Sequence, residues 1–243
     1  MNWDAFFRLH RDLPREGPGE PADVAWAGAF LSLPAGAAIC DAACGPGADI
    51  AALQALAPGA RVTAFDGHLP FVEAARAAHP EARVLQGRLI AREEGLPDPP
   101  SLGPFDLIWC AGAMYFEGIE ACLKRWRSAL KPGGTIAFSE CCWFTDTPSD
   151  AARAMWEEYP AMTNAAGVTK WIAQAGYEIL GQKRLSDAAW EAYYTPMDAR
   201  IAALRPEADA ALTDVLDMAV EEARIWRAHR TEFGYLLSVV RPL

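Results

Sequence analysis

Basic side chains are scarce in this sequence. It has 22 lysines and arginines against 32 aspartates and glutamates, which leaves a formal net charge of −10 over 243 residues. Proteins bind the phosphate backbone of nucleic acids mainly through clustered lysine and arginine side chains. The shortage therefore argues against an RNA or DNA partner, and we expect the partner to be a small molecule.

Long apolar runs and paired cysteine motifs are also missing. No stretch of about 18 uncharged apolar residues is present, and residues 1–7 lack the basic start and apolar run of a signal peptide. We therefore expect a cytoplasmic protein without membrane insertion. The six cysteines include no pair of CxxC motifs, the usual ligand pattern of a structural zinc site. We expect no metal, and reduced thiols packed as small hydrophobic side chains.

What the sequence does contain is an alternation of short apolar runs with helical periods. The apolar runs predict strands at residues 37–41, 62–66, 83–86, 105–110, 135–139, 177–180 and 235–240. Strands that alternate with helices are typical of a parallel sheet covered by helices on both faces. The pattern thus predicts an α/β, Rossmann-like, doubly wound and mostly parallel sheet of seven strands.

The length and the 52% share of hydrophobic residues favour a single domain. Within residues 1–243 we expect an N-terminal cap segment (1–35), a core (36–142) and a C-terminal half (143–243). Apolar residues at helical spacing from Leu212 to Trp226 predict that residues 186–232 form a helical lid. The proline-rich residues 96–100 are predicted to form a loop.

A nucleotide-type ligand is indicated by the loops after the first two strands. Ligands of open parallel sheets lie beyond the carboxyl ends of the strands. Gly45 and Gly47 allow a sharp turn and a close approach of the backbone. Asp66 follows about 20 residues later, where an acid can bind the ribose hydroxyls. The alternative explanations are an ordinary structural turn and a helix-capping acid.

An NAD(P)-dependent oxidoreductase would also have an acid at the position of Asp66. Against it, Ile50 stands where the dinucleotide fingerprint requires Gly or Ala, and a Tyr-x-x-x-Lys pair is absent. A non-catalytic protein that keeps the fold as a binding module is the second alternative.

Residues 39–47 (ICDAACGPG) resemble motif I of class I S-adenosylmethionine-dependent methyltransferases, an acid followed by two residues and C-G-x-G. Residues 86–88, 105–115 and 130–134 are similar to three further motifs of that family, in the same order. Residues 105–109, 112–115 and 139–145 resemble its small-molecule branch, which includes the ubiquinone and menaquinone biosynthesis methyltransferases. The resemblance covers residues 36–142, and it implies methyl transfer and an antiparallel final strand.

The resemblance also implies that S-adenosylmethionine is the cofactor. Asp41 and the loop 43–47 would hold its methionine portion, Asp66 its ribose, and Phe71 and Leu89 the two faces of its adenine. The cofactor-binding residues implied are Asp41, Ala43, Cys44, Gly45, Gly47, Asp66, Gly67, Phe71, Gly87, Arg88, Leu89 and Cys110, with Arg15 as a partner for the cofactor carboxylate. For Phe71, Leu89 and Cys110 the alternative is packing in the core.

The acceptor side is less specified. Gly112, Tyr115, Trp143 and Tyr193 are the candidate acceptor-binding residues, with packing as the alternative in a chain of nine tryptophans. Methyl transfer from a sulfonium mainly requires alignment of donor and nucleophile, so a base is optional. If a proton must leave, the candidate bases are Glu140, His68 and His229. The residues identify no particular acceptor, and both a monomer and a homodimer remain open.

Overall fold

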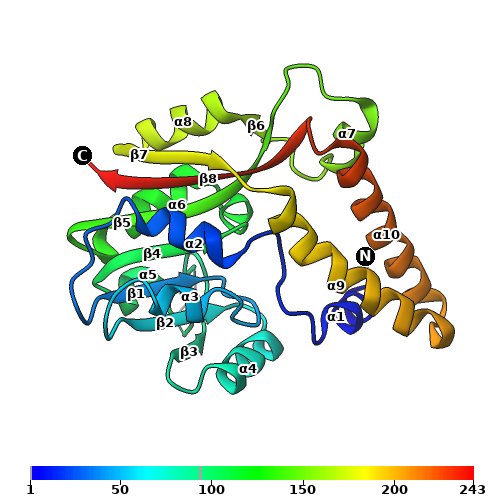
Figure 1. The fold of residues 1–243 in the computed structure, drawn as a ribbon, viewed down its shortest axis with the longest axis horizontal. Coiled ribbons are helices and arrows are strands. Elements are labelled where there is room, and N and C mark those ends of the chain that lie inside the picture. Colours follow the sequence, from blue (N-terminus) through cyan, green and yellow to red (C-terminus); the bar gives the residue numbers. More distant parts are fainter. Residues whose placement is uncertain (1, 93–94) are drawn as a thin grey trace.

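A single twisted sheet forms the centre of the computed structural model, which describes residues 2–92 and 95–243 (Figure 1). Its strands are β1 (Ala38–Ala42), β2 (Arg61–Asp66), β3 (Arg83–Gln86), β4 (Phe105–Ala111), β5 (Leu130–Trp143), β6 (Thr163–Asn164), β7 (Tyr177–Arg184) and β8 (Phe233–Pro242). They are ordered β3-β2-β1-β4-β5-β8-β7, and the two-residue β6 pairs with β5 beside this path.

The strand directions confirm the predicted doubly wound sheet. β1 pairs in parallel with β2 and β4, β2 with β3, and β4 with β5. β8 runs antiparallel to both β5 and β7, as the resemblance implied. Seven strands were predicted and all seven form; the short β6 is an addition.

Helices cover both faces of the sheet. They are α1 (Trp3–His10), α2 (Pro21–Gly28), α3 (Ile50–Gln54), α4 (Leu69–Ala78), α5 (Pro99–Leu102), α6 (Ile119–Trp126), α7 (Asp150–Met155), α8 (Ala165–Gln174), α9 (Asp187–Leu204) and α10 (Ala210–His229), with 3-10 turns η1 (Met114–Phe116), η2 (Arg127–Ala129) and η3 (Arg205–Glu207). One core joins α2, α3 and α4 to the sheet, and another joins α6 and α8 to its opposite face.

A third core lies beyond the carboxyl ends of the parallel strands, where α1, α9 and α10 gather (Figure 1). The stretch predicted as one lid segment is two helices. The Ser186 side chain caps α9 and the Asp209 side chain caps α10, each by accepting a backbone N–H three residues ahead. Pro206 lies in the 3-10 turn between them, and proline at that point interrupts helical hydrogen bonding. We call α9 and α10 the lid helices.

Two local predictions were wrong. Residues 96–100 were predicted to form a loop; residues 96–98 do, but Pro99 begins α5 because proline fits the first turn of a helix and Asp98 forms a capping box with Ser101. The fifth strand was predicted from residue 135, but β5 begins at Leu130 and takes in the glycine turn through a register shift against β4. No helix within the described residues is long and apolar enough to cross a membrane.

Candidate functional site

The loop between β1 and α3 turns sharply at the edge of the sheet. Ala43, Gly45 and Gly47 have φ values of 58°, 54° and 95°, a region that strongly favours glycine. The Cys44 amide donates to the Phe65 carbonyl at 2.9 Å, which ties the loop to β2. The loop is therefore held in one strained conformation with its backbone close to the strand ends.

Asp66 ends β2 and organises this loop. Its carboxylate accepts hydrogen bonds from the Gly45 amide at 3.0 Å and from the His68 amide at 2.8 Å. Burial raises the pKa of the Asp66 carboxyl, and these two amides oppose that shift. The predicted ribose-binding acid thus lies directly beside the predicted glycine loop.

Three acids and one arginine lie at the base of the loop. Asp41 is 3% exposed, and its Oδ2 atom is buried without a hydrogen-bond partner among the described residues. Burial raises the pKa of the Asp41 carboxyl, the charges of Asp49 and Asp66 raise it further, and Arg15 opposes them. The Arg15 guanidinium lies 3.3 Å from Asp49 Oδ1, and the Trp109 indole donates to Asp49 Oδ2 at 2.9 Å.

The N-terminal segment lies against the loop. A Cβ atom on Gly45 would be 3.2 Å from Glu16 Cγ, and Glu16 Oε2 lies 2.6 Å from His10 Nδ1. The Phe7 ring stacks on His68 at a centroid distance of 3.6 Å, and His68 meets the edge of Phe71 at 4.6 Å. Because α1 is thereby packed onto the loops after β1 and β2, it covers the region where the nucleoside was predicted.

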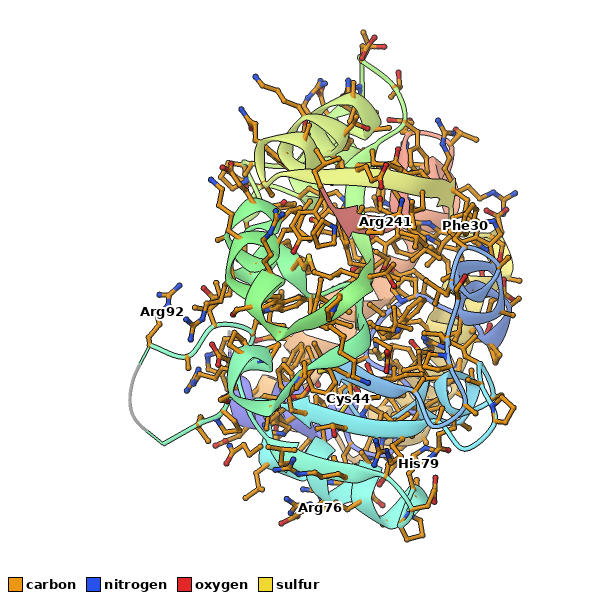
Figure 2. The ribbon with its side chains drawn as sticks, turned by 90° about the vertical axis from the view of Figure 1, so that its left-hand side faces the viewer. Phe30, Cys44, Arg76, His79, Arg92 and Arg241 are labelled. Atoms are coloured by element: carbon orange, nitrogen blue, oxygen red, sulfur yellow. The ribbon has the colours of Figure 1, made fainter. Side chains whose placement is uncertain are left out.

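The segment after β3 completes this edge. The Gly87 amide donates to the Asp66 carbonyl at 3.0 Å, and the Gln86 side chain donates to the Gly67 carbonyl at 2.9 Å. Leu89 is buried and its carbonyl accepts from the Trp126 indole at 2.8 Å, whereas the Arg88 side chain is exposed. Farther along this segment, Arg92 projects at the periphery of the molecule (Figure 2).

The family is settled by comparison with known proteins. A family model described as a methyltransferase domain matches residues 39–134. The chain is 30% identical over 185 residues to the trans-aconitate 2-methyltransferase of Paracidovorax citrulli (strain AAC00-1), across 72% of this chain and 68% of the relative. The chain belongs to the class I S-adenosylmethionine-dependent methyltransferases.

Two solved methyltransferase structures in complex with S-adenosyl-L-homocysteine share the fold. The one from Geobacter sulfurreducens has a TM-score of 0.79 at 18% identity, over 99% of this chain and 98% of that one. The one from Thiobacillus denitrificans has a TM-score of 0.76 at 19% identity, over 98% of each chain. The family assignment confirms S-adenosylmethionine as the cofactor of this methyltransferase and favours methyl transfer over the two alternatives.

The residues of the methyltransferase fit this cofactor chemically. Its methionine portion carries an ammonium group, a positive sulfonium and a carboxylate. The unpartnered Asp41 oxygen and the neighbouring acids suit the positive groups, and the Arg15 guanidinium suits the carboxylate.

A second group of polar side chains lies where β4 and β5 end. The Gly112 amide donates to the Ser139 carbonyl at 3.2 Å, so Glu140 follows immediately beside the end of β4. Glu140 is completely buried, and neither carboxylate oxygen has a hydrogen-bond partner of good geometry among the described residues. Burial raises the pKa of Glu140 to about 8, although the nearby Tyr159 hydroxyl lowers it. The Tyr115 ring lies 5.6 Å from the Tyr159 ring.

Gly112 marks a close approach between this group and β8. Its φ is 63°, and a Cβ atom there would lie 2.6 Å from the Tyr235 ring. Tyr235 and Tyr115 lie within electrostatic reach of each other and of Glu140, and burial raises the pKa of both hydroxyls. Two tyrosines and a buried carboxyl therefore surround the end of β4.

A cavity of about 490 Å³ lies between α1, α7 and the lid helices. We call it the lid cavity; its apolar walls include Phe6, Leu9, Met155, Met197, Val215 and Ile225. Tyr193, predicted to bind the acceptor, lines it, and so do Tyr194 and Glu222. Tyr193 packs in the same hydrophobic cluster as Tyr235 and Tyr159, so this wall of the lid cavity adjoins the group at the end of β4.

Other predicted residues lie elsewhere. Cys110 is fully buried in the core on the α6 face of the sheet. Trp143 packs edge-on against Phe233 at 6.2 Å beneath the lid helices. His68 lies in the aromatic stack with Phe7. His229 is held by Glu232 at 2.7 Å and by Ser149 at 3.1 Å.

Glu16, Asp49, Glu222 and Tyr235 were not predicted as site residues from the sequence. Asp49 could have been found as the residue that precedes α3 in the glycine loop, and Glu16 as the neighbour of Arg15. Glu222 and Tyr235 have no local signal, because only the packing of α10 against α1 and of β8 against β5 brings them to the site.

Proposed function

We propose that this methyltransferase transfers the methyl group of S-adenosylmethionine to a small-molecule acceptor held beneath the lid helices. The lid cavity carries this proposal, because its volume of about 490 Å³ is in the range typical of small-ligand pockets. The net charge of −10 further opposes a nucleic-acid acceptor.

The cofactor-binding roles belong to the same proposal. Asp41 and the 43–47 loop hold the methionine portion, with Arg15 on its carboxylate. Asp66 binds the ribose, while residues 67, 71 and 87–89 line the adenine. The support is the short distance between the glycine loop and the Asp66 carboxylate and the unpartnered oxygen of Asp41.

S-adenosylmethionine supplies an electrophilic methyl group on a positively charged sulfur. The protein's part is to align the acceptor with that group and to exclude water. Where the acceptor atom carries a proton, Glu140 takes it onto its carboxylate, while Tyr115 and Tyr235 wall the path. A carboxyl with a pKa of about 8 is suited to proton transfer near neutral pH.

The relative's name raises trans-aconitate as a candidate acceptor. That molecule carries three carboxylates, and proteins bind such groups mainly through arginine and lysine. Among the residues described as lining the lid cavity there is neither, whereas Asp217, Glu221 and Glu222 are all acidic. We therefore propose an acceptor other than a tricarboxylate.

The test is formation of S-adenosylhomocysteine with a panel of quinols, phenols, amines and trans-aconitate. We expect turnover with a small molecule, and Asp66→Ala should weaken cofactor binding by about 10- to 100-fold, as two charge-assisted hydrogen bonds would account for. Calorimetric titration with S-adenosylmethionine measures this directly. Turnover of trans-aconitate alone, or unchanged cofactor affinity in Asp66→Ala, would contradict the proposal.

A further inference from the structure

The carboxylates of the lid cavity differ in what neutralises them. Glu221 pairs with Arg224 at 2.6 Å and Asp217 pairs with Arg205 at 2.7 Å, and all four side chains are exposed. Glu222 forms no such ion pair among the described residues. Its hydrogen-bond partner is the Tyr194 hydroxyl, which donates to Glu222 Oε1 at 3.0 Å. Among the described residues, no lysine or arginine lies within 4.0 Å of the Glu222 carboxylate. Of the three acids that line the lid cavity, Glu222 is therefore the one without a lysine or arginine counter-ion among the described residues.

Glu222 lines the lid cavity and is exposed on that side. The protein around its carboxyl raises the pKa. His10 opposes that shift, but the His10 ring already lies 2.6 Å from Glu16. Beside apolar walls a carboxylate attracts a cation more strongly than it does in bulk water, so Glu222 is suited to pair with a positively charged group that enters the cavity.

The walls suit an apolar molecule with a cationic end. Phe6, Tyr193 and Tyr194 contribute aromatic rings to the same cavity as the carboxylate. The negative faces of such rings attract an ammonium group, and their area favours an apolar body. An anion with the same body would keep the apolar contact but would lose the attraction to the ring faces and be repelled by the carboxylate.

We propose that the lid cavity binds the ammonium group of an apolar amine, with Glu222 as its counter-ion. This rests on the proposed function, because it names the class of acceptor that the methyltransferase takes. A carboxylate partner keeps an amine protonated, and a protonated nitrogen has no lone pair to attack a methyl group. The anchored nitrogen is therefore not the methylated atom. The molecule extends past Tyr193 and presents another nucleophilic atom to the group of side chains at the end of β4.

Three probes with one apolar body test the charge preference: phenylbutylamine, phenylbutanol and phenylbutyrate. Each is titrated calorimetrically into the protein saturated with S-adenosylhomocysteine. We expect the amine to bind at least about tenfold more tightly than the carboxylate, since one charge-assisted hydrogen bond corresponds to such a ratio. Glu222→Gln should remove the amine's advantage and leave the alcohol's affinity unchanged. Asp214→Asn, an exposed acid on the same helix, is the matched control and should change neither.

Every outcome either supports or overturns amine binding by the lid cavity. A cavity that binds the three probes equally, prefers the carboxylate or binds none of them would overturn the proposal, as would an unchanged amine affinity in Glu222→Gln. Binding of S-adenosylhomocysteine and methyl transfer are measured on the same samples. If those fail while amine selectivity persists, the proposed function is refuted and the amine site stands.

Discussion

Replacing Glu140 by glutamine should change how stability depends on pH. The pKa of this carboxyl is raised from 4.5 in the unfolded chain to about 8 in the folded protein. Between those values the folded state holds a proton that the unfolded state has released, so stability is lost as the pH rises through this window. At about 1.4 kcal/mol per pKa unit, the loss is roughly 3 kcal/mol at pH 7, or about 10 °C in Tm for a protein of this size.

Glutamine does not titrate, so Glu140→Gln should escape this loss. In thermal melts from pH 5 to pH 9, the Tm of the variant should increase relative to that of the wild type as the pH rises. This relative increase should be complete above about pH 8. The cost of burying the glutamine amide does not depend on pH, so it cancels when the slopes of Tm against pH are compared. Glu178→Gln, an exposed acid paired with Arg241, is the control and should follow the wild type. Parallel curves for wild type and Glu140→Gln would refute the burial argument.

The same variant tests the chemistry. Loss of a general base typically lowers kcat by about 10²- to 10⁴-fold. In the wild type kcat/KM should rise with pH and level off above about 8, because the ionised carboxyl is the active form. Full activity in Glu140→Gln would show that Glu140 does not take the proton.

Two further predictions concern the backbone and the buried ion pair. Gly112→Ala would place a Cβ atom 2.6 Å from the Tyr235 ring at a positive φ, so we expect a loss of roughly 1–3 kcal/mol in chemical denaturation; an unchanged midpoint would contradict the observed packing. Arg15→Ala should weaken binding of S-adenosylhomocysteine by about tenfold or more and leave methylthioadenosine, which lacks the carboxylate, unaffected. Equal weakening of both ligands would assign Arg15 a structural role through Asp49.

The sheet was predictable because its signals are local. Each of the seven strands is an apolar run bounded by turn residues, and Asp66 follows the glycine loop at a spacing set by one β-α-β unit. The errors arose where local rules compete. Pro99 can start a helix or interrupt one, and the capping partners Asp98 and Ser101 decide which. The single-domain assignment stays a prediction.

The acceptor side was only partly predictable. Tyr193 was predicted as an acceptor-binding residue from its place in an aromatic segment, and it lines the lid cavity. Glu222 instead reads as one more acid on a helix with several. Its environment is created by α1, which lies about 200 residues earlier in the sequence and packs against α10. Likewise Tyr235 reads as a strand residue, and only the register of β8 with β5 brings it to Gly112. Contacts between such distant segments leave no periodic trace in the sequence.

The position of β8 affects how the chain can fold during synthesis. This strand is translated after the other seven, yet it lies between β5 and β7 and its residues 233–240 are all buried. Until it leaves the ribosome, β5 and β7 present open hydrogen-bonding edges, and such edges are prone to pair with other chains. A nascent chain stalled before Phe233 should therefore depend on chaperones, whereas the strands β1 to β4 can already pair.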